Sequence, residues 1–301
     1  MELFEFRTQD MKDTNRKISI ISGPCSAEDR SQVLSVAAYC AEKRFDWFRA
    51  GIWKPRTKPG SFEGLGSPAL DWLSEAQNEY GIAAMTEAAN GQHVEHILEH
   101  HLRGVWIGAR TAVNPFYVQE IADALKGADI DVFVKNPINP DMKLWMGAIE
   151  RLERAGVRSV SAIHRGFAMY GQSKFRNEPY WQIPIEIMTE RPDLPMYCDI
   201  SHIAGTRDFL GELAQKALDL NYNGLMIETH PHPEEAMSDR EQQLRPDQLS
   251  HLLESLVIRK PFEDDLTTQE LILYREQMDG IDEQLVRLLA KRMDLSSRIG
   301  K

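Results

Sequence analysis

Cysteine is scarce in this sequence of 301 residues, which contains only Cys25, Cys40 and Cys198. An odd and sparse set of cysteines excludes a disulfide-stabilised secreted scaffold and is typical of a reduced protein. No run of about 18 apolar residues is present, which argues against a membrane-spanning helix. The polar segment 1–17 lacks the apolar core of a signal peptide. We therefore expect a cytoplasmic protein.

Positive charge is also in deficit, because 46 Asp and Glu outnumber 35 Lys and Arg and give a net charge of −11. A surface of this sign repels nucleic acid and anionic membranes, so neither is an expected partner. In contrast, hydrophobic residues make up 42% of the chain. That content is enough for the core of one large domain with a smaller appendage.

Short apolar runs recur along the chain, and each ends in Gly, Pro or a polar cluster. Eight of them are predicted strands, at 18–23, 47–53, 81–86, 104–108, 131–135, 159–164, 196–200 and 224–228. Segments with helical periodicity alternate with them, at 29–43, 68–80, 92–101, 115–125, 144–155, 181–190, 206–220 and 246–257. This alternation predicts βα units and a parallel sheet. Eight units in about 250 residues predict a (β/α)8 TIM barrel, with an open doubly wound sheet as the alternative.

The C-terminal part of the chain, residues 259–301, does not continue this alternation of strands and helices. Residues 1–258 form the predicted barrel domain, and the charged, Pro-containing segment 259–268 is a predicted linker. Apolar residues in 269–301 recur at alternating steps of three and four, which predicts a long amphipathic helix with a coiled-coil-like seam. Arg292 occupies a seam position where an apolar residue is expected.

Cations cluster at the ends of the predicted strands, which would meet at one face of a barrel. They are Arg49, Lys54, Arg56, Arg110, Lys135 and Arg165. Converging cations repel each other unless anions occupy the space between them. Arginine and lysine both bind phosphate and carboxylate, so a ligand with several negative charges is expected. For any single cation, an ion pair with a carboxylate such as Glu87 is the alternative.

We also expect a metal site, because four potential ligands lie near the first and the last two predicted strands: Cys25, His202, Glu228 and Asp239. This mixture of sulfur, nitrogen and oxygen donors favours Mn, Fe, Co or Zn over Mg or Ca. The alternative ligands are His164, His230 and Asp199. Cys40 and Cys198 are expected to be core residues, and the histidines at 93, 96, 100 and 101 to lie on an exposed helix face.

Seven motifs contain most of these residues: GPCS at 23–26, RAGIWKPRT at 49–57, IGAR at 107–110, VKNP at 134–137, DISH at 199–202, GLMIETHP at 224–231 and SDREQQL at 238–244. Together they resemble the type I, short β subfamily of 3-deoxy-D-arabino-heptulosonate-7-phosphate (DAHP) synthases, over about residues 15–258. The resemblance implies a condensation of phosphoenolpyruvate with D-erythrose 4-phosphate that releases inorganic phosphate. That reaction is the first step of the shikimate pathway.

The resemblance also implies roles for single residues. One divalent metal ion would be bound by Cys25, His202, Glu228 and Asp239. Phosphoenolpyruvate would be bound by Arg49, Lys54, Arg110, Lys135 and Arg165, and the erythrose phosphate by Arg56 and Thr57. The predicted catalytic residues are Lys54, Cys25 and His202, with Lys54 as a candidate proton donor. We further expect a homo-oligomer, either a dimer or a tetramer.

The C-terminal segment has a resemblance of its own, carried by LYREQMDGIDEQL at 273–285 and LLAKRM at 288–293. These residues resemble the first helix of an AroQ-type chorismate mutase. The resemblance implies that Arg275 and Arg292 correspond to substrate-binding arginines. Because the sequence stops at Lys301, before the other helices of that family, we expect a truncated fusion without mutase activity.

Three alternative functions remain. A 3-deoxy-D-manno-octulosonate-8-phosphate (KDO8P) synthase shares the fold and the donor but uses arabinose 5-phosphate, and KPRT at 54–57 favours the erythrose enzyme. A Schiff-base aldolase would use Lys54 or Lys135 and no metal. A non-catalytic regulatory barrel would keep the fold without turnover.

Overall fold

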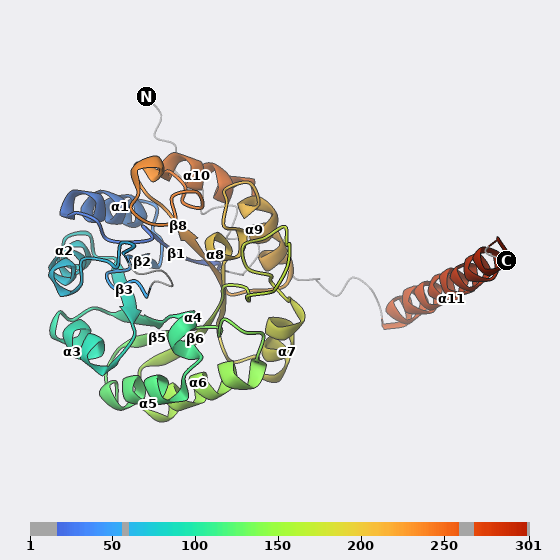
Figure 1. Ribbon diagram of the computed structural model, residues 1–301, viewed down its shortest axis with the longest axis horizontal. Coiled ribbons are helices and arrows are strands. Elements are labelled where there is room, and N and C mark those ends of the chain that lie inside the picture. The colour runs from blue at the N-terminus through green and yellow to red at the C-terminus, as the bar shows by residue number, and fades with distance from the viewer. Residues whose placement is uncertain (1–16, 56–59, 259–267, 300–301) are drawn as a thin grey trace. The chain divides into compact units, whose positions relative to one another are not determined.

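The computed structural model describes residues 17–55, 60–258 and 268–299, with part of the side chains of the last segment. Its eight strands are all parallel and pair in sequence order, and β1 pairs with β8 to close the barrel (Figure 1). They are β1 Ser19–Gly23, β2 Trp47–Arg49, β3 Ala83–Ala88, β4 Gly104–Ile107, β5 Asp131–Lys135, β6 Ser159–His164, β7 Met196–Asp199 and β8 Gly224–Glu228. The predicted TIM barrel is confirmed, and the open sheet is wrong.

Eight helices surround the barrel in the described part of the chain: α1 Arg30–Glu42, α2 Leu70–Tyr80, α3 Gly91–Glu99, α5 Pro115–Ala124, α6 Met142–Arg154, α7 Gln182–Glu190, α9 Leu210–Asp219 and α10 Pro246–Ser255. Local sequence explains several of their starts, because a side-chain oxygen that accepts from the first free backbone N–H stabilises a helix N-terminus. Asp29 caps α1, Asn90 caps α3 and Asp141 caps α6 in this way.

Four short elements follow the strands or precede a helix, and the sequence pattern did not predict them as separate helices. They are η2 Ser67–Ala69, α4 Ala109–Ala112, α8 Ile200–Ala204 and η3 Pro233–Glu235. Strand β2 is also shorter than predicted. Ala50 N still donates to the Met85 carbonyl of β3, but Gly51 N donates to the Cys25 carbonyl, in the loop after β1, over 3.2 Å.

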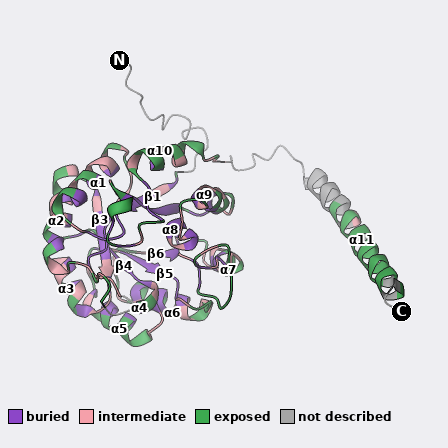
Figure 2. Cartoon of the chain, turned by 45° about the horizontal axis from the view of Figure 1, so that its top comes forward, coloured by how far each residue is buried: buried purple, intermediate pink, exposed green. Residues whose placement is uncertain are grey.

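Two apolar layers hold the barrel together. Inside it, large side chains from successive strands fill the interior: Ile21, Met85, Trp106, Phe133, Ile163, Tyr197 and Met226. A larger cluster packs the helices onto the outer face of the strands, and Figure 2 shows the buried strands inside the ring of half-exposed helices. Because side chains fill the interior, ligands have access to the strands only at their ends.

Helix α11 (Thr268–Ile299) belongs to a second compact unit, separate from the barrel unit that contains residues 16–258. Several apolar side chains of α11 are exposed, for example Met278 (64%) and Leu288 (62%). No described helix is both long enough and apolar enough to cross a membrane. Residues 259–267, most of the predicted linker, lie outside the described residues, so the domain boundaries stay a prediction.

Candidate metal and anion site

A cluster of potential metal ligands lies at the carboxyl ends of β1 and β8. Gly23 pairs in register with Glu228 across the closure, and Cys25 follows two residues after Gly23. Ligand atoms of Cys25, Glu228 and Asp239 all lie within 4.8 Å of one another. The lack of a side chain at Gly23 lets the backbone of Arg49 approach this end of β1, because a Cβ atom there would lie 1.9 Å from the Arg49 carbonyl oxygen. The barrel closure thus brings together residues from opposite ends of the domain.

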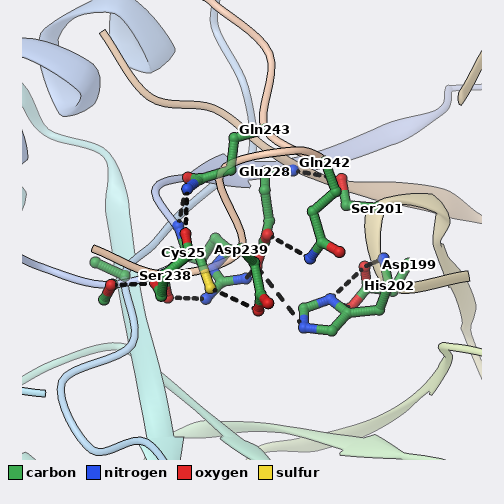
Figure 3. Close-up of polar contacts among 12 residues, drawn as sticks. Cys25, Asp199, Ser201, His202, Glu228, Ser238, Asp239, Gln242 and Gln243 are labelled. Atoms are coloured by element: carbon green, nitrogen blue, oxygen red, sulfur yellow. Dashed lines mark hydrogen bonds and ion pairs between the residues drawn. The ribbon is translucent and has the colours of Figure 1, made fainter. Parts of the chain in front are cut away.

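His202 is the fourth candidate ligand, and it comes from α8, directly after β7. Its Nε2 lies 3.8 Å from Oε1 of Glu228 (Figure 3), whereas its Nδ1 lies 2.9 Å from Oδ2 of Asp199. Asp199 also caps α8 by accepting from the backbone N–H of His202. A carboxylate that holds one imidazole nitrogen fixes the orientation of the other, as is usual for metal-binding histidines. Burial lowers the pKa of His202, which favours the neutral imidazole that a metal requires.

Cys25 is fully buried, and its thiol lies 3.3 Å from Oδ2 of Asp239. Burial raises the pKa of this thiol to about 12, and the charge of Glu228 adds to the rise. A bound cation would reverse this effect, because metal ligation displaces the thiol proton. The donor set of one sulfur, one nitrogen and two carboxylates therefore fits a divalent transition metal.

Two of the predicted anion-binding cations are paired with carboxylates in this structure. Arg49 donates to Oε1 of Glu228 over 2.7 Å, and Lys135 donates to Oδ2 of Asp199 over 2.7 Å. Both cations are buried, and both lie over the ring of Trp106. Glu87, the carboxylate considered in the sequence analysis, accepts from the indole N–H of Trp106 instead. The two ion pairs hold these cations against the ligand cluster.

Lys54 and Arg165 lie nearer to open space. The ammonium of Lys54 lies 3.0 Å from Sγ of Cys25 and also donates to the Cys25 carbonyl. Burial lowers the pKa of Arg165 to about 10; the Asp199 carboxylate opposes this fall, and the like charges of Arg176 and Arg110 add to it. An anionic ligand next to Arg165 would stabilise its desolvated guanidinium.

A pocket of about 620 Å³ opens beside this cluster, lined in part by Lys174, Arg176, Thr206, Asp239 and Gln242. It lies between the loop that precedes α7 and the loop that follows η3. Three cations, Lys174, Arg176 and Arg240, therefore line the same space as the candidate metal ligand Asp239 and the acidic Glu241. This position suits a phosphorylated substrate next to a metal.

Some predicted residues are not tested by these contacts. Arg56 and Thr57 lie outside the described residues, and so does the side chain of Arg275. Arg110 is exposed at the start of α4, and Arg292 is exposed on α11. Their predicted roles in binding stay predictions.

Of the three alternative ligands, His164 and His230 do not join the cluster, and Asp199 contacts it through Nδ1 of His202. His164 points into the core, where its Nε2 lies 2.7 Å from the Pro179 carbonyl and its Nδ1 2.9 Å from the Tyr222 hydroxyl. His230 accepts from the backbone N–H of His232, and its Nε2 lies 3.6 Å from Glu28. The expectation of an exposed face was wrong for His93, His96 and His100, which are half-buried, and right for His101; the ring of His93 stacks on Trp53 at 3.8 Å.

Three side chains that contact the ligand cluster were given no role from the sequence. Gln242 and Gln243 lie three and four residues after Asp239, and their place in the motif at 238–244 was the available signal. Arg176 donates to Oδ1 of Asp239 over 2.9 Å. It lies in the long loop between β6 and α7, where no local pattern distinguishes it.

A closed barrel with reactive side chains at the carboxyl ends of its strands defines a TIM-barrel enzyme. Residues 5–260 match the model of the DAHP synthetase I family. The chain belongs to this family, and it is accordingly a transferase of the 3-deoxy-7-phosphoheptulonate synthase class.

Individual relatives agree with this assignment. A phospho-2-dehydro-3-deoxyheptonate aldolase of Thermotoga maritima is 30% identical over 235 residues, which are 78% of this chain and 68% of that protein. A crystal structure of the DAHP synthase from Thermotoga maritima has a TM-score of 0.71 at 28% identity and covers 80% of this chain and 68% of that chain. A 2-dehydro-3-deoxyphosphooctonate aldolase of Dechloromonas aromatica is less similar, at 26% identity over 79% of this chain and 89% of that protein.

Proposed function

We propose that this chain condenses phosphoenolpyruvate with D-erythrose 4-phosphate in a reaction that depends on one divalent metal ion. The observation that carries the proposal is the juxtaposition of two features at the mouth of one barrel. Cys25, Glu228 and Asp239 offer ligand atoms within 4.8 Å of each other, and the Lys54 ammonium lies 3.0 Å from the Cys25 sulfur. Family membership supports the reaction class.

The proposed metal ligands are Cys25, His202, Glu228 and Asp239. Mn, Fe, Co and Zn are the candidate ions, because the set combines a thiolate and an imidazole with carboxylates. A bound ion would act as a Lewis acid toward the aldehyde oxygen of the sugar phosphate. Asp199 would hold His202 in the orientation that this requires, through the contact at 2.9 Å.

The proposed role of the cations is to bind and orient phosphoenolpyruvate. Lys54, Arg110 and Arg165 would bind its carboxylate and phosphate, with Arg49 and Lys135 beneath them. The enol carbon then attacks the aldehyde carbon, water adds to the carbon that bears the phosphate ester, and inorganic phosphate leaves. Cations in fixed positions stabilise the negative oxygens that form during these reaction steps, and they do not need to reorganise. Lys54 is the proposed donor of a proton to the new hydroxyl.

Phosphate release with both substrates tests the proposal. We expect turnover with erythrose 4-phosphate, loss of turnover after treatment with EDTA, and recovery when Mn²⁺ is added. Cys25→Ala should lower turnover at least about a hundredfold, because it removes one ligand of the ion. A matched control is Cys40→Ala, since Cys40 is a buried core residue outside the cluster.

The same experiment separates the alternatives. Faster turnover with arabinose 5-phosphate would favour the octulosonate reaction, which the Dechloromonas aromatica relative makes the nearest rival. Turnover that survives EDTA and is trapped by borohydride would favour a Schiff base at Lys54 or Lys135. No turnover under any metal condition would favour a regulatory barrel. The short β subfamily, the mutase origin of α11 and a dimeric or tetrameric state also remain proposals.

A further inference from the structure

Two consecutive glutamines, Gln242 and Gln243, are completely buried beside the ligand cluster. They follow η3 and precede Leu244, which forms a parallel bridge with Thr229 after β8. A buried amide needs hydrogen-bond partners on both its oxygen and its nitrogen. Both partners of Gln243, and one of the two partners of Gln242, lie on segments that carry candidate metal ligands (Figure 3).

Gln243 joins two backbone segments. Its Oε1 accepts from the backbone N–H of Cys25 over 2.9 Å, and its Nε2 donates to the Ser238 carbonyl over 2.8 Å. Ser238 immediately precedes Asp239. One side-chain amide therefore fixes the separation between the loop that carries the thiol and the turn that carries the carboxylate.

Gln242 orients the carboxylate of Glu228. Its Nε2 donates to Oε2 of Glu228 over 2.7 Å, and its Oε1 accepts from Nη1 of Arg176 over 2.9 Å. The same Nη1 donates to Oδ1 of Asp239 over 2.9 Å. Gln242 and Arg176 therefore link the two carboxylates. The other oxygen of each carboxylate lies near another candidate ligand: Oε1 of Glu228 near His202, and Oδ2 of Asp239 near Cys25.

The turn that carries Asp239 requires such support. Asp239 has φ +43°, a left-handed conformation that is uncommon for a residue other than glycine. Residues in such conformations persist where the surrounding structure holds them. The backbone N–H of Gln242 contributes to this by donating to the Asp239 carbonyl over 3.2 Å.

We propose that Gln242 and Gln243 are positioning residues that fix the spacing of Cys25, Glu228 and Asp239 and thereby set the affinity of the site for a divalent metal ion. This inference rests on the proposed metal site. Neither glutamine is a proposed ligand of the ion. Each acts through the ligand to which it is bonded, as outer partners of metal ligands do.

The test uses the full chain with Co²⁺, because cobalt bound to a thiolate has a charge-transfer absorption band that reports the Cys25–metal contact. The variants are Gln242→Met and Gln243→Met, which keep the approximate shape without the amide. Gln242→Asn and Gln243→Asn keep the amide but shorten it, so that it cannot reach both partners. The control is Gln119→Met, at an exposed position on α5.

We expect each of the four variants to bind Co²⁺ about 10- to 100-fold more weakly than the wild type, with a weaker or shifted thiolate band. The unfolding temperature of the metal-free protein is measured in parallel, and the control should match the wild type in every respect. If a Met variant does not fold, the Asn variant at the same position decides the outcome.

Two failures are distinguishable. A wild-type chain that binds Co²⁺ without a thiolate band would contradict the proposed metal site itself. A wild-type chain with the band, and folded variants whose affinities stay within about twofold of it, would overturn the role of the two glutamines while leaving the proposed function intact.

Discussion

Trp106 illustrates how one residue organises the charges inside the barrel. Its ring lies 4.7 Å from the guanidinium carbon of Arg49 and 5.6 Å from the ammonium of Lys135. Both distances are within the range of a cation–π interaction, which grows stronger when the cation is desolvated. Its indole N–H donates to Glu87 over 3.0 Å, which fixes the plane of the ring. Trp106 therefore supports two of the proposed phosphoenolpyruvate-binding cations without being charged itself.

Replacing Trp106 by leucine should raise the KM for phosphoenolpyruvate about tenfold, because the loss of two cation–π contacts costs about 1–2 kcal/mol. Trp106→Phe should raise it less, since a ring remains under both cations. Steady-state kinetics with varied phosphoenolpyruvate measures the effect. Trp145→Leu is the control, because Trp145 is equally buried but packs in the outer layer and donates to the Val134 carbonyl. Equal KM changes in Trp106→Leu and Trp145→Leu would reject the specific role of Trp106.

Among the elements, α8 and α11 differ in length and in the compact unit to which they belong. Helix α8 has only five residues, but its N-cap Asp199 fixes both His202 and Lys135. Helix α11 has 32 residues and belongs to the other compact unit. One helix cannot bury its own apolar stripe, and Leu285 and Leu288 on α11 are exposed.

A chain that ends after Ile258 should fold and unfold as the full chain does. Within the described residues, the barrel closes and its outer ring of helices is complete without α11. We expect the midpoint of thermal unfolding to change by less than about 2 °C, equivalent to less than about 1 kcal/mol. Calorimetry of both chains measures this, with phosphate release as a check of the site. A larger fall in the midpoint would mean that α11 stabilises the barrel.

At the scale of the whole molecule, burial of neutral histidines makes the stability depend on pH. Burial lowers the pKa of His164 to about 3 and that of His93 to about 4. In the unfolded chain both groups titrate near about 6.5, so the unfolded state binds more protons at pH values below this. The stabilisation is therefore fully present above about pH 6.5 and is lost as the pH falls toward 3.

Urea unfolding at pH 7.5 and pH 5.0 tests this dependence. For His164 alone, the wild type should lose about 2 kcal/mol of unfolding free energy between the two values. His164→Gln should lose correspondingly less, although it is less stable at pH 7.5 because the contacts to Pro179 and Tyr222 change. His251→Gln, at an exposed position on α10, should keep the wild-type dependence. An unchanged dependence in His164→Gln would show that other groups cause it.

The sequence by itself determined the strand and helix order. The bounds of β5, β6 and β8 were predicted to the residue; in β5 and β8 the interior residues form a continuous apolar run, as is typical of buried parallel strands. The same local signal located the candidate ligands Cys25 and Glu228, which follow or end strands. The end of β2 could not be predicted in this way, since Gly51 completes its hydrogen bonding with the neighbouring loop rather than with a strand.

Only the tertiary structure decided which side chains pair. Arg49 and Glu228 are 179 positions apart, and Lys135 and Asp199 are 64 positions apart, so no local pattern links them. Their contacts depend on the order and register in which the eight strands close, and above all on the pairing of β1 with β8. The amides of Gln242 and Gln243 are bonded to ligand-bearing segments for the same reason. The sequence determines which reactive side chains are present, and closure of the barrel determines which of them contact each other.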